Sequence, residues 1–138
     1  MRTPRRFGTL GWLLLVCAAV ALAVSVVSAA GLLDGKSFAG ETGEVGKTKG
    51  DPDGFIFQDG TFRSTACDQY GFKVALYTAT KNGDGSFSWT ATTESPKEGK
   101  MAWKGTVKGE AIDGKVSWSK AGQKTIDYWF KGMLKKAA

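Results

Sequence analysis

The sequence predicts an all-β fold, an antiparallel up-and-down meander of about eight strands that closes into a small barrel. Apolar and polar side chains alternate along most of the chain, which places them on opposite faces of pleated strands. The alternating segments are joined by short turns rich in glycine, aspartate and asparagine, and no segment has helical periodicity. Closure into a barrel removes exposed strand edges. A sandwich of two four-stranded sheets is the alternative.

Residues 1–30 have the organisation of a secretory signal peptide. Arg2, Arg5 and Arg6 precede an apolar run from Leu10 to Val27, and the run ends in small residues with the spacing of a cleavage site. We expect export to the periplasm or the extracellular space, with no stable membrane span after cleavage. A retained membrane anchor is the alternative, since the run is close to the roughly 20 residues that span a bilayer.

The first two predicted strands flank a polar segment. Lys36 to Gly40 predicts a short strand, and Gly54 to Gln58 predicts a second one with Phe55 and Phe57 on one face. Between them, residues 41–53 contain three glycines and almost no apolar side chain. Because such a segment cannot bury itself, we expect a flexible glycine-rich loop.

A break in the pattern separates the next two strands. Asp59-Gly60 is a tight-turn signal before a strand from Thr61 to Thr65. Ala66 to Gly71 interrupts the alternation and predicts a turn or a short helical corner. Phe72 to Thr80 alternates again, but apolar residues occupy both of its faces, so the sequence does not decide which face points inward.

The second half of the chain alternates more regularly. Ser86 to Thr93 predicts a strand, and Ser95–Gly99 is a turn whose proline cannot donate to a strand ladder. Lys100 to Trp118 predicts a hairpin with its large apolar residues on one face and lysine, serine and threonine on the other. A last strand, from Thr125 to about Leu134, places Trp129 on the outer face.

Removal of the signal leaves residues 31–138, enough for a single domain with one hydrophobic core. These residues carry 16 basic and 13 acidic side chains, a net charge of +3, which does not indicate nucleic-acid binding. The net charge is −3 over residues 31–96 and +6 over residues 97–138. This asymmetry indicates either an ordinary soluble surface or a basic face that docks an anionic polymer or an acidic protein. The candidate residues of that face are Lys104, Lys108, Lys115 and Lys131.

The composition argues against catalysis. The chain has no histidine, which removes Ser-His and Cys-His nucleophiles and the most common metal ligand. Most carboxylates lie in glycine-rich turns, where we expect contact with solvent to leave them without the perturbed pKa values typical of catalytic groups. Asp51–Gly54 and Asn82–Gly85 resemble the start of calcium loops, yet Phe62 and Thr93 stand where the required glutamate belongs. We therefore expect a non-enzymatic protein with no metal site and no cofactor.

Cys67 is the single cysteine of residues 31–138, so no disulfide can form within that part of the chain. The functional interpretations are a reactive thiol, a covalent attachment point, or an intermolecular disulfide that links a homodimer. Arg63 and Lys73 favour a lower thiol pKa, whereas Asp68 opposes it. The alternative is a small buried side chain at a corner of the barrel.

Aromatic side chains on the predicted inner faces are candidates for a ligand site. A barrel of eight strands is just wide enough to be filled by side chains or to hold one small ligand. These rings therefore either fill the barrel or line a pocket for a small apolar or amphipathic ligand or an envelope component. The candidate ligand-binding residues are Phe57, Phe87, Trp89, Trp103, Trp118 and Tyr128.

Three segments resemble a group of small exported bacterial proteins: T-A-C-D-Q-Y-G-F at Thr65–Phe72, S-P-K-E-G at Ser95–Gly99 and W-K-G-T-V-K-G at Trp103–Gly109. The resemblance covers essentially all of residues 31–138 and implies export, but it brings no activity with it. More distantly, the expected architecture is similar to that of calycins, the lipocalin and avidin barrels. Those barrels usually open with G-x-W, whereas this chain has Gly35-Lys36-Ser37-Phe38, and no ligand residue is carried over.

Overall fold

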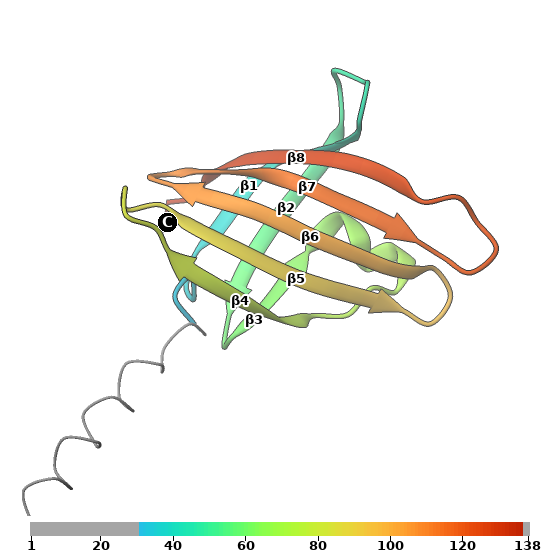
Figure 1. The fold of residues 1–138 in the computed structure, drawn as a ribbon, viewed down its shortest axis with the longest axis horizontal. Helices are drawn as coiled ribbons and strands as arrows, with labels where there is room; N and C mark the ends of the chain where they lie inside the picture. Colours follow the sequence, from blue (N-terminus) through green and yellow to red (C-terminus); the bar gives the residue numbers. More distant parts are fainter. Residues whose placement is uncertain (1–30, 137–138) are drawn as a thin grey trace, which may run out of the picture.

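The computed structural model describes residues 31–136, and the signal segment predicted over residues 1–30 lies outside them. Eight antiparallel strands follow one another in chain order, and the first pairs with the last to close a barrel (Figure 1). This confirms the predicted meander and closed barrel in place of the sandwich. The elements are β1 (Ser37–Glu44), β2 (Asp51–Gln58), β3 (Thr61–Ser64), the 3-10 helix η2 (Thr65–Tyr70), β4 (Ala75–Lys81), β5 (Phe87–Ser95), β6 (Gly99–Lys108), β7 (Ala111–Ser119) and β8 (Ile126–Leu134). Within residues 31–136, no helix has the length and apolar character needed to cross a bilayer.

Strands β1 and β2 extend further than the sequence predicts. A loop was expected over residues 41–53, but Thr42 pairs with Asp51, and only Val45–Gly50 connects the two strands. The glycines in this region allow close strand pairing, because a Cβ atom at Gly40 would collide with a carbonyl group of β8. Gly43, one of the three glycines that suggested a loop, also belongs to β1 and therefore to the barrel wall.

The structure decides the inner face of β4. The strand predicted from Phe72 begins only at Ala75, because η2 and the turn after it occupy the preceding residues. Tyr77 and Ala79 are buried inside the barrel, whereas Leu76 is 78% exposed. The predicted break in the alternation is confirmed as η2.

Aromatic rings fill the middle of the barrel. The ring centroids of Trp89 and Trp103 lie 4.7 and 4.9 Å from that of Phe62, and Phe57 meets Trp89 edge-on at 4.9 Å. All four rings are almost completely buried. Each such side chain contributes about 1.5–3 kcal/mol through its burial, and edge-on ring contacts add to this. At this level the barrel interior is a packed core.

A short turn over residues 31–35 closes one end of the barrel. Leu33 is fully buried there, and its backbone N–H donates to the hydroxyl of Tyr77 at 2.9 Å. The same hydroxyl donates to Asp34 at 2.8 Å, and Asp34 accepts the N–H of Gly60 at 3.0 Å. These bonds fix Leu33 as a plug beneath the aromatic core. We call this the closed end.

Candidate functional site

A pocket of about 360 Å³ opens at the other end of the barrel, which we call the mouth. The β1–β2 loop, η2, and the β5–β6 and β7–β8 turns lie at this end of the barrel (Figure 1). This volume is at the lower end of the roughly 300–1,000 Å³ that small-molecule sites occupy. The large apolar and aromatic residues of its lining are Tyr70, Phe72, Met101, Trp118, Ile126 and Tyr128.

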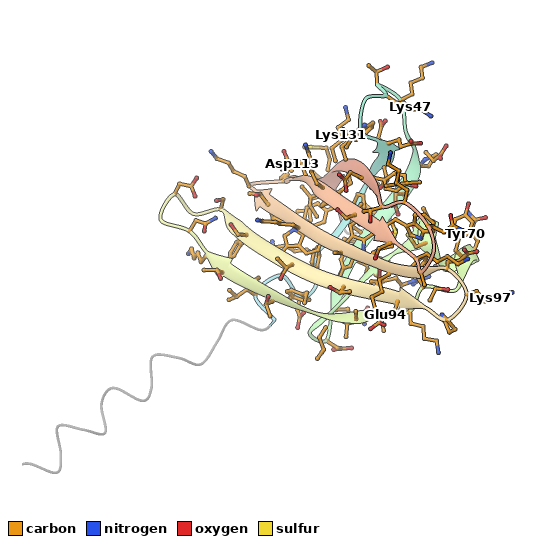
Figure 2. All side chains as sticks on the ribbon, turned by 45° about the vertical axis from the view of Figure 1, so that its right-hand side comes forward. Lys47, Tyr70, Glu94, Lys97, Asp113 and Lys131 are labelled. Carbon is orange, nitrogen blue, oxygen red and sulfur yellow. The ribbon has the colours of Figure 1, made fainter. Side chains whose placement is uncertain are left out.

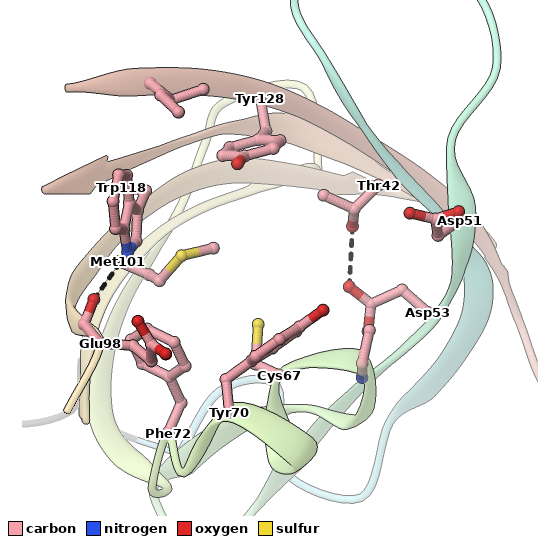
Figure 3. Close-up of a pocket in the computed structure, with 12 residues that line it drawn as sticks. Thr42, Asp51, Asp53, Cys67, Tyr70, Phe72, Glu98, Met101, Trp118 and Tyr128 are labelled. Atoms are coloured by element: carbon pink, nitrogen blue, oxygen red, sulfur yellow. Dashed lines mark hydrogen bonds between the residues drawn. The ribbon is translucent and has the colours of Figure 1, made fainter. Parts of the chain in front are cut away.

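The upper wall of the pocket comes from neighbouring positions on three strands. Met101 of β6 lies opposite Trp118 of β7, which in turn lies opposite Ile126 of β8. The indole N–H of Trp118 donates to the carbonyl of Glu98 at 2.7 Å, which fixes the ring against the β5–β6 turn. Figure 3 shows this wall facing η2 across the pocket. Period-two alternation on β6–β8 therefore produces an ordered apolar surface at the mouth.

The floor of the pocket is η2. Its end is fixed by Gly71, whose φ of 82° is in the left-handed region that favours glycine. The N–H groups of Gly71 and Phe72 donate to the carbonyls of Asp68 and Cys67 at 3.0 and 3.4 Å. This geometry brings the side chains of Cys67, Tyr70 and Phe72 to the underside of the pocket (Figure 3).

Asp53 supplies a buried carboxylate at the pocket wall and is 8% exposed. The hydroxyls of Thr42 and Ser64 donate to it at 2.7 and 2.8 Å. The backbone N–H groups of Gly54 and Ala66 donate at 2.8 and 3.0 Å. All these donors are neutral, and no lysine or arginine within residues 31–136 forms an ion pair with Asp53. One carboxylate thus joins β1, β2, β3 and η2.

Every charged side chain that lines the pocket is acidic, namely Asp51, Asp53 and Glu98. Glu98 pairs with Lys120 at 3.2 Å, so its charge is largely compensated. Asp51 is exposed and forms no ion pair with any residue that the structure describes. The lining therefore carries net negative charge.

The sulfur of Cys67 points from η2 into the pocket (Figure 3). The pKa of this thiol is raised to about 11, mainly by burial and in smaller part by the charges of Asp53 and Asp68, while a hydrogen bond with Ser64 opposes the rise. The thiol is therefore protonated at neutral pH, which is its less nucleophilic form. Arg63, which the sequence suggested as an activating cation, instead pairs with Asp68. This environment is that of a buried thiol at a barrel corner.

The structure divides the six candidate ligand-binding residues into three groups. Trp118 and Tyr128 line the pocket. Phe57, Trp89 and Trp103 belong to the packed core and are not part of its lining. Phe87, the first residue of β5, lies toward the closed end, away from the mouth.

Several pocket residues were not among the sequence-based candidates. Met101 and Ile126 could have been found from the alternation of β6 and β8, as Trp118 was from the alternation of β7. Tyr70 lies in η2 and Phe72 lies beside it. The alternation ends there, so the sequence does not show which of these side chains point into the barrel. The role of Asp53 depends on donors up to 13 residues away and carries no local signal.

The predicted basic face is divided as well. Lys104 lies opposite Lys115 on the β6–β7 pair, and Lys115 lies opposite Trp129 on the β7–β8 pair. The ammonium of Lys131 is 5.4 Å from the centroid of the Trp129 ring. Lys108 lies nearer the closed end, 3.9 Å from a carboxylate of the β4–β5 turn. Three of the four lysines therefore lie on neighbouring strands on the side of the barrel that carries the half-buried Trp129.

Trp129 lies on the outer face, as predicted, for a structural reason. Its indole N–H donates to the carbonyl of Lys47 at 2.9 Å. The ring also covers Gly43, where a Cβ atom would lie 2.5 Å from it. Trp129 thus holds the β1–β2 loop against β8, and Lys47 lies on the same side of the barrel as Lys131 (Figure 2).

Comparisons with family models, curated proteins and solved structures give no significant match. The eight-stranded up-and-down barrel is consistent with the calycin-like architecture expected from the sequence. Barrels of this kind serve many functions, so any function must be argued from the site.

Proposed function

We propose that the protein is an exported, non-enzymatic binding protein that holds a small apolar or amphipathic molecule in its mouth pocket. The observation that supports this most strongly is the cavity of about 360 Å³ next to a solidly packed core. Since aromatic rings fill the middle of the barrel, the mouth pocket is the part of the barrel that can hold a ligand. The signal-like character of residues 1–30 supports export.

The composition of the pocket suits binding better than chemistry. Binding sites are mostly apolar with a few fixed polar groups, and this lining combines aromatic and aliphatic side chains with a small number of carboxylates. The buried Asp53 already accepts bonds from neutral donors, and Cys67 is held protonated. Among the described residues, no lysine or arginine lines the pocket, so neither group has a cation there that would activate it for catalysis.

Binding of N-phenyl-1-naphthylamine, a neutral dye that fluoresces in apolar surroundings, tests the proposal. We expect exported protein to bind the dye saturably. Ile126→Trp places an added indole in the mouth and should weaken dye binding by about tenfold or more. Leu76→Trp adds the same ring at a position that is 78% exposed on the outer surface and should leave binding unchanged. If the folded Ile126→Trp variant binds the dye as tightly as the unmodified protein, the pocket is not the site.

A second candidate function is docking on an anionic polymer through the outer face around Trp129. It is favoured by the grouping of Lys104, Lys115 and Lys131, none of which forms an ion pair with a described residue. Neighbouring unpaired cations attract a polyanion, and the attraction weakens as salt is added.

Retention on dextran sulfate, with neutral dextran as the control polymer, tests this second function. The triple change of Lys104, Lys115 and Lys131 to glutamine should abolish retention at about 0.15 M salt. A control triple of equal charge, with glutamine at Lys73, Lys97 and Lys124, should retain most of it. Equal losses in both triples would show that net charge, rather than this face, is responsible.

A further inference from the structure

Four aromatic side chains approach the mouth pocket from two sides. Trp118 and Tyr128 extend from the β7–β8 wall, while Tyr70 and Phe72 extend from η2 and the residue after its cap (Figure 3). Aromatic faces carry negative potential and attract cations within about 6 Å of the ring centre. Pockets that combine several rings in this way suit ammonium groups with apolar substituents.

The charges in the lining act in the same direction as the rings. Asp51, Asp53 and Glu98 line the pocket, and no lysine or arginine does. Asp53 is buried among neutral donors, so its charge is stabilised by hydrogen bonds but is not cancelled by a cation. A charge in such surroundings acts on a bound ligand through a lower dielectric constant than that of water.

Two titrating groups of the pocket have raised pKa values, mainly because they are buried and in smaller part because negative charges lie nearby. Burial is the largest cause of the raised pKa of Cys67, and the negative charges of Asp53 and Asp68 add to it. Burial also raises the pKa of Tyr128, and the nearby Glu44 carboxylate contributes in the same direction. The smaller, charge-dependent part of each shift shows that an additional negative charge inside the mouth is disfavoured.

Lysines near the mouth do not reverse this balance. Lys120 pairs with Glu98 at 3.2 Å and offsets that one carboxylate. Other lysines at this end are Lys47 and Lys49 on the β1–β2 loop, Lys73 after η2, and Lys97 and Lys124 on the β5–β6 and β7–β8 turns. All five are outside the lining and exposed to solvent. Charges in that position are screened at physiological salt. The net charge next to a bound molecule is therefore that of Asp51 and Asp53.

We infer that the mouth pocket takes an organic cation, an amine or a quaternary ammonium group carried on an apolar body. The apolar body packs between Met101 and the aromatic rings, while the cationic group lies toward Asp51 and Asp53. An anionic head group would meet carboxylates and ring faces without a compensating cation. The inference rests on the proposed function and names the chemical class of its ligand.

Three probes with the same ten-carbon chain test the inference: decyltrimethylammonium, 1-decanol and decanoate, each below its micelle concentration. Their ability to displace N-phenyl-1-naphthylamine from exported protein is measured at about 0.15 M salt. We expect decyltrimethylammonium to bind tightest and decanoate at least about tenfold more weakly. Decanoate that matches or exceeds the ammonium probe overturns the inference but leaves the proposed function intact. If neither the dye nor any probe binds, the proposed function fails as well.

A pair of matched variants tests whether the charge of the pocket lining, rather than the net charge of the protein, favours the cation. Asp51→Asn removes an exposed charge from the lining and should weaken decyltrimethylammonium about threefold, with 1-decanol unchanged. Asp59→Asn removes an exposed carboxylate at the β2–β3 turn of the closed end, where asparagine tolerates the φ of 53°, and should change neither. Equal ammonium affinities in both variants and the unmodified protein would contradict a role for the lining charge.

Discussion

Replacement of Asp53 by alanine should destabilise the barrel strongly. The carboxylate accepts bonds from the hydroxyls of Thr42 and Ser64 and from the N–H groups of Gly54 and Ala66. Bonds to a charged group contribute about 1.5–3 kcal/mol each, but losses within one network are not additive. Because the buried hydroxyl of Ser64 and three part-buried donors lose their acceptor together, we expect the free energy of unfolding to fall by about 3–5 kcal/mol.

Urea unfolding at pH 7, followed by circular dichroism, measures this loss. With an m value of about 1.5 kcal/mol/M, the midpoint should fall by roughly 2–3 M. Thr42→Val and Ser64→Ala each remove one donor and should cost about 1–2 kcal/mol. Asp113→Ala is the control, since this carboxylate is exposed and forms no ion pair with a described residue. A difference below about 1 kcal/mol between the Asp53 and Asp113 variants would refute the proposed network.

Three further predictions concern the thiol, a wall glycine and the plug. The pKa of Cys67 is about 11, above its ordinary value of 9.0, so iodoacetamide should label the folded protein slowly at pH 7, and stability should fall as the pH rises from about 9 through 11. Rapid labelling of folded protein at pH 7 would contradict this. Gly105→Ala places a Cβ 2.7 Å from the Phe130 ring and should cost about 1–3 kcal/mol in urea unfolding, whereas Gly83→Ala meets no atom within 4 Å and should be nearly neutral. Leu33→Ala should lower the melting temperature through a loss of about 2–5 kcal/mol, and alanine at its exposed neighbour Leu32 should not; equal effects would exclude the plug.

The fold could be predicted from the sequence because its main signal is local. Period-two alternation identifies the strands of the second half, and β5–β6 and β6–β7 pair there in long, uninterrupted registers. The prediction was least accurate where strands are made from polar or glycine-rich segments. Residues 41–44 and 51–53 form strands because β1 is held on both sides, by β2 and by β8. That tertiary pairing has no counterpart in a single segment's composition.

The candidate site was predictable only in part, because position along the barrel axis is not encoded in alternation. Trp89, Trp103 and Trp118 all point inward, and the pattern treats them alike. Trp89 and Trp103 lie where rings from other strands meet, so they are buried on all sides. Trp118 is the last residue of β7 that pairs with β8, at the mouth, and therefore borders the pocket. Distinguishing these cases requires the register of all eight strands.

The pocket and the corner beside it have a common origin. β3 has four residues and shares only two register pairs with β4, whereas β5 and β6 share nine. After Ser64 the chain therefore turns across the mouth as η2 instead of extending the wall. The side chains that η2 presents there include the small Ala66 and Cys67, while β6–β8 continue opposite with large ones, and the difference in size leaves the cavity.

Asp53 lies at the junction of these two features. It accepts the N–H of Ala66 near the start of η2, and its charge also borders the cavity. A neutral acceptor at this position would hold the corner less strongly, and a cation beside it would cancel the field inside the pocket. The carboxylate that fixes the turn is therefore the same group that sets the sign of the ligand we infer, so the stability of the corner and the selectivity of the mouth depend on one side chain.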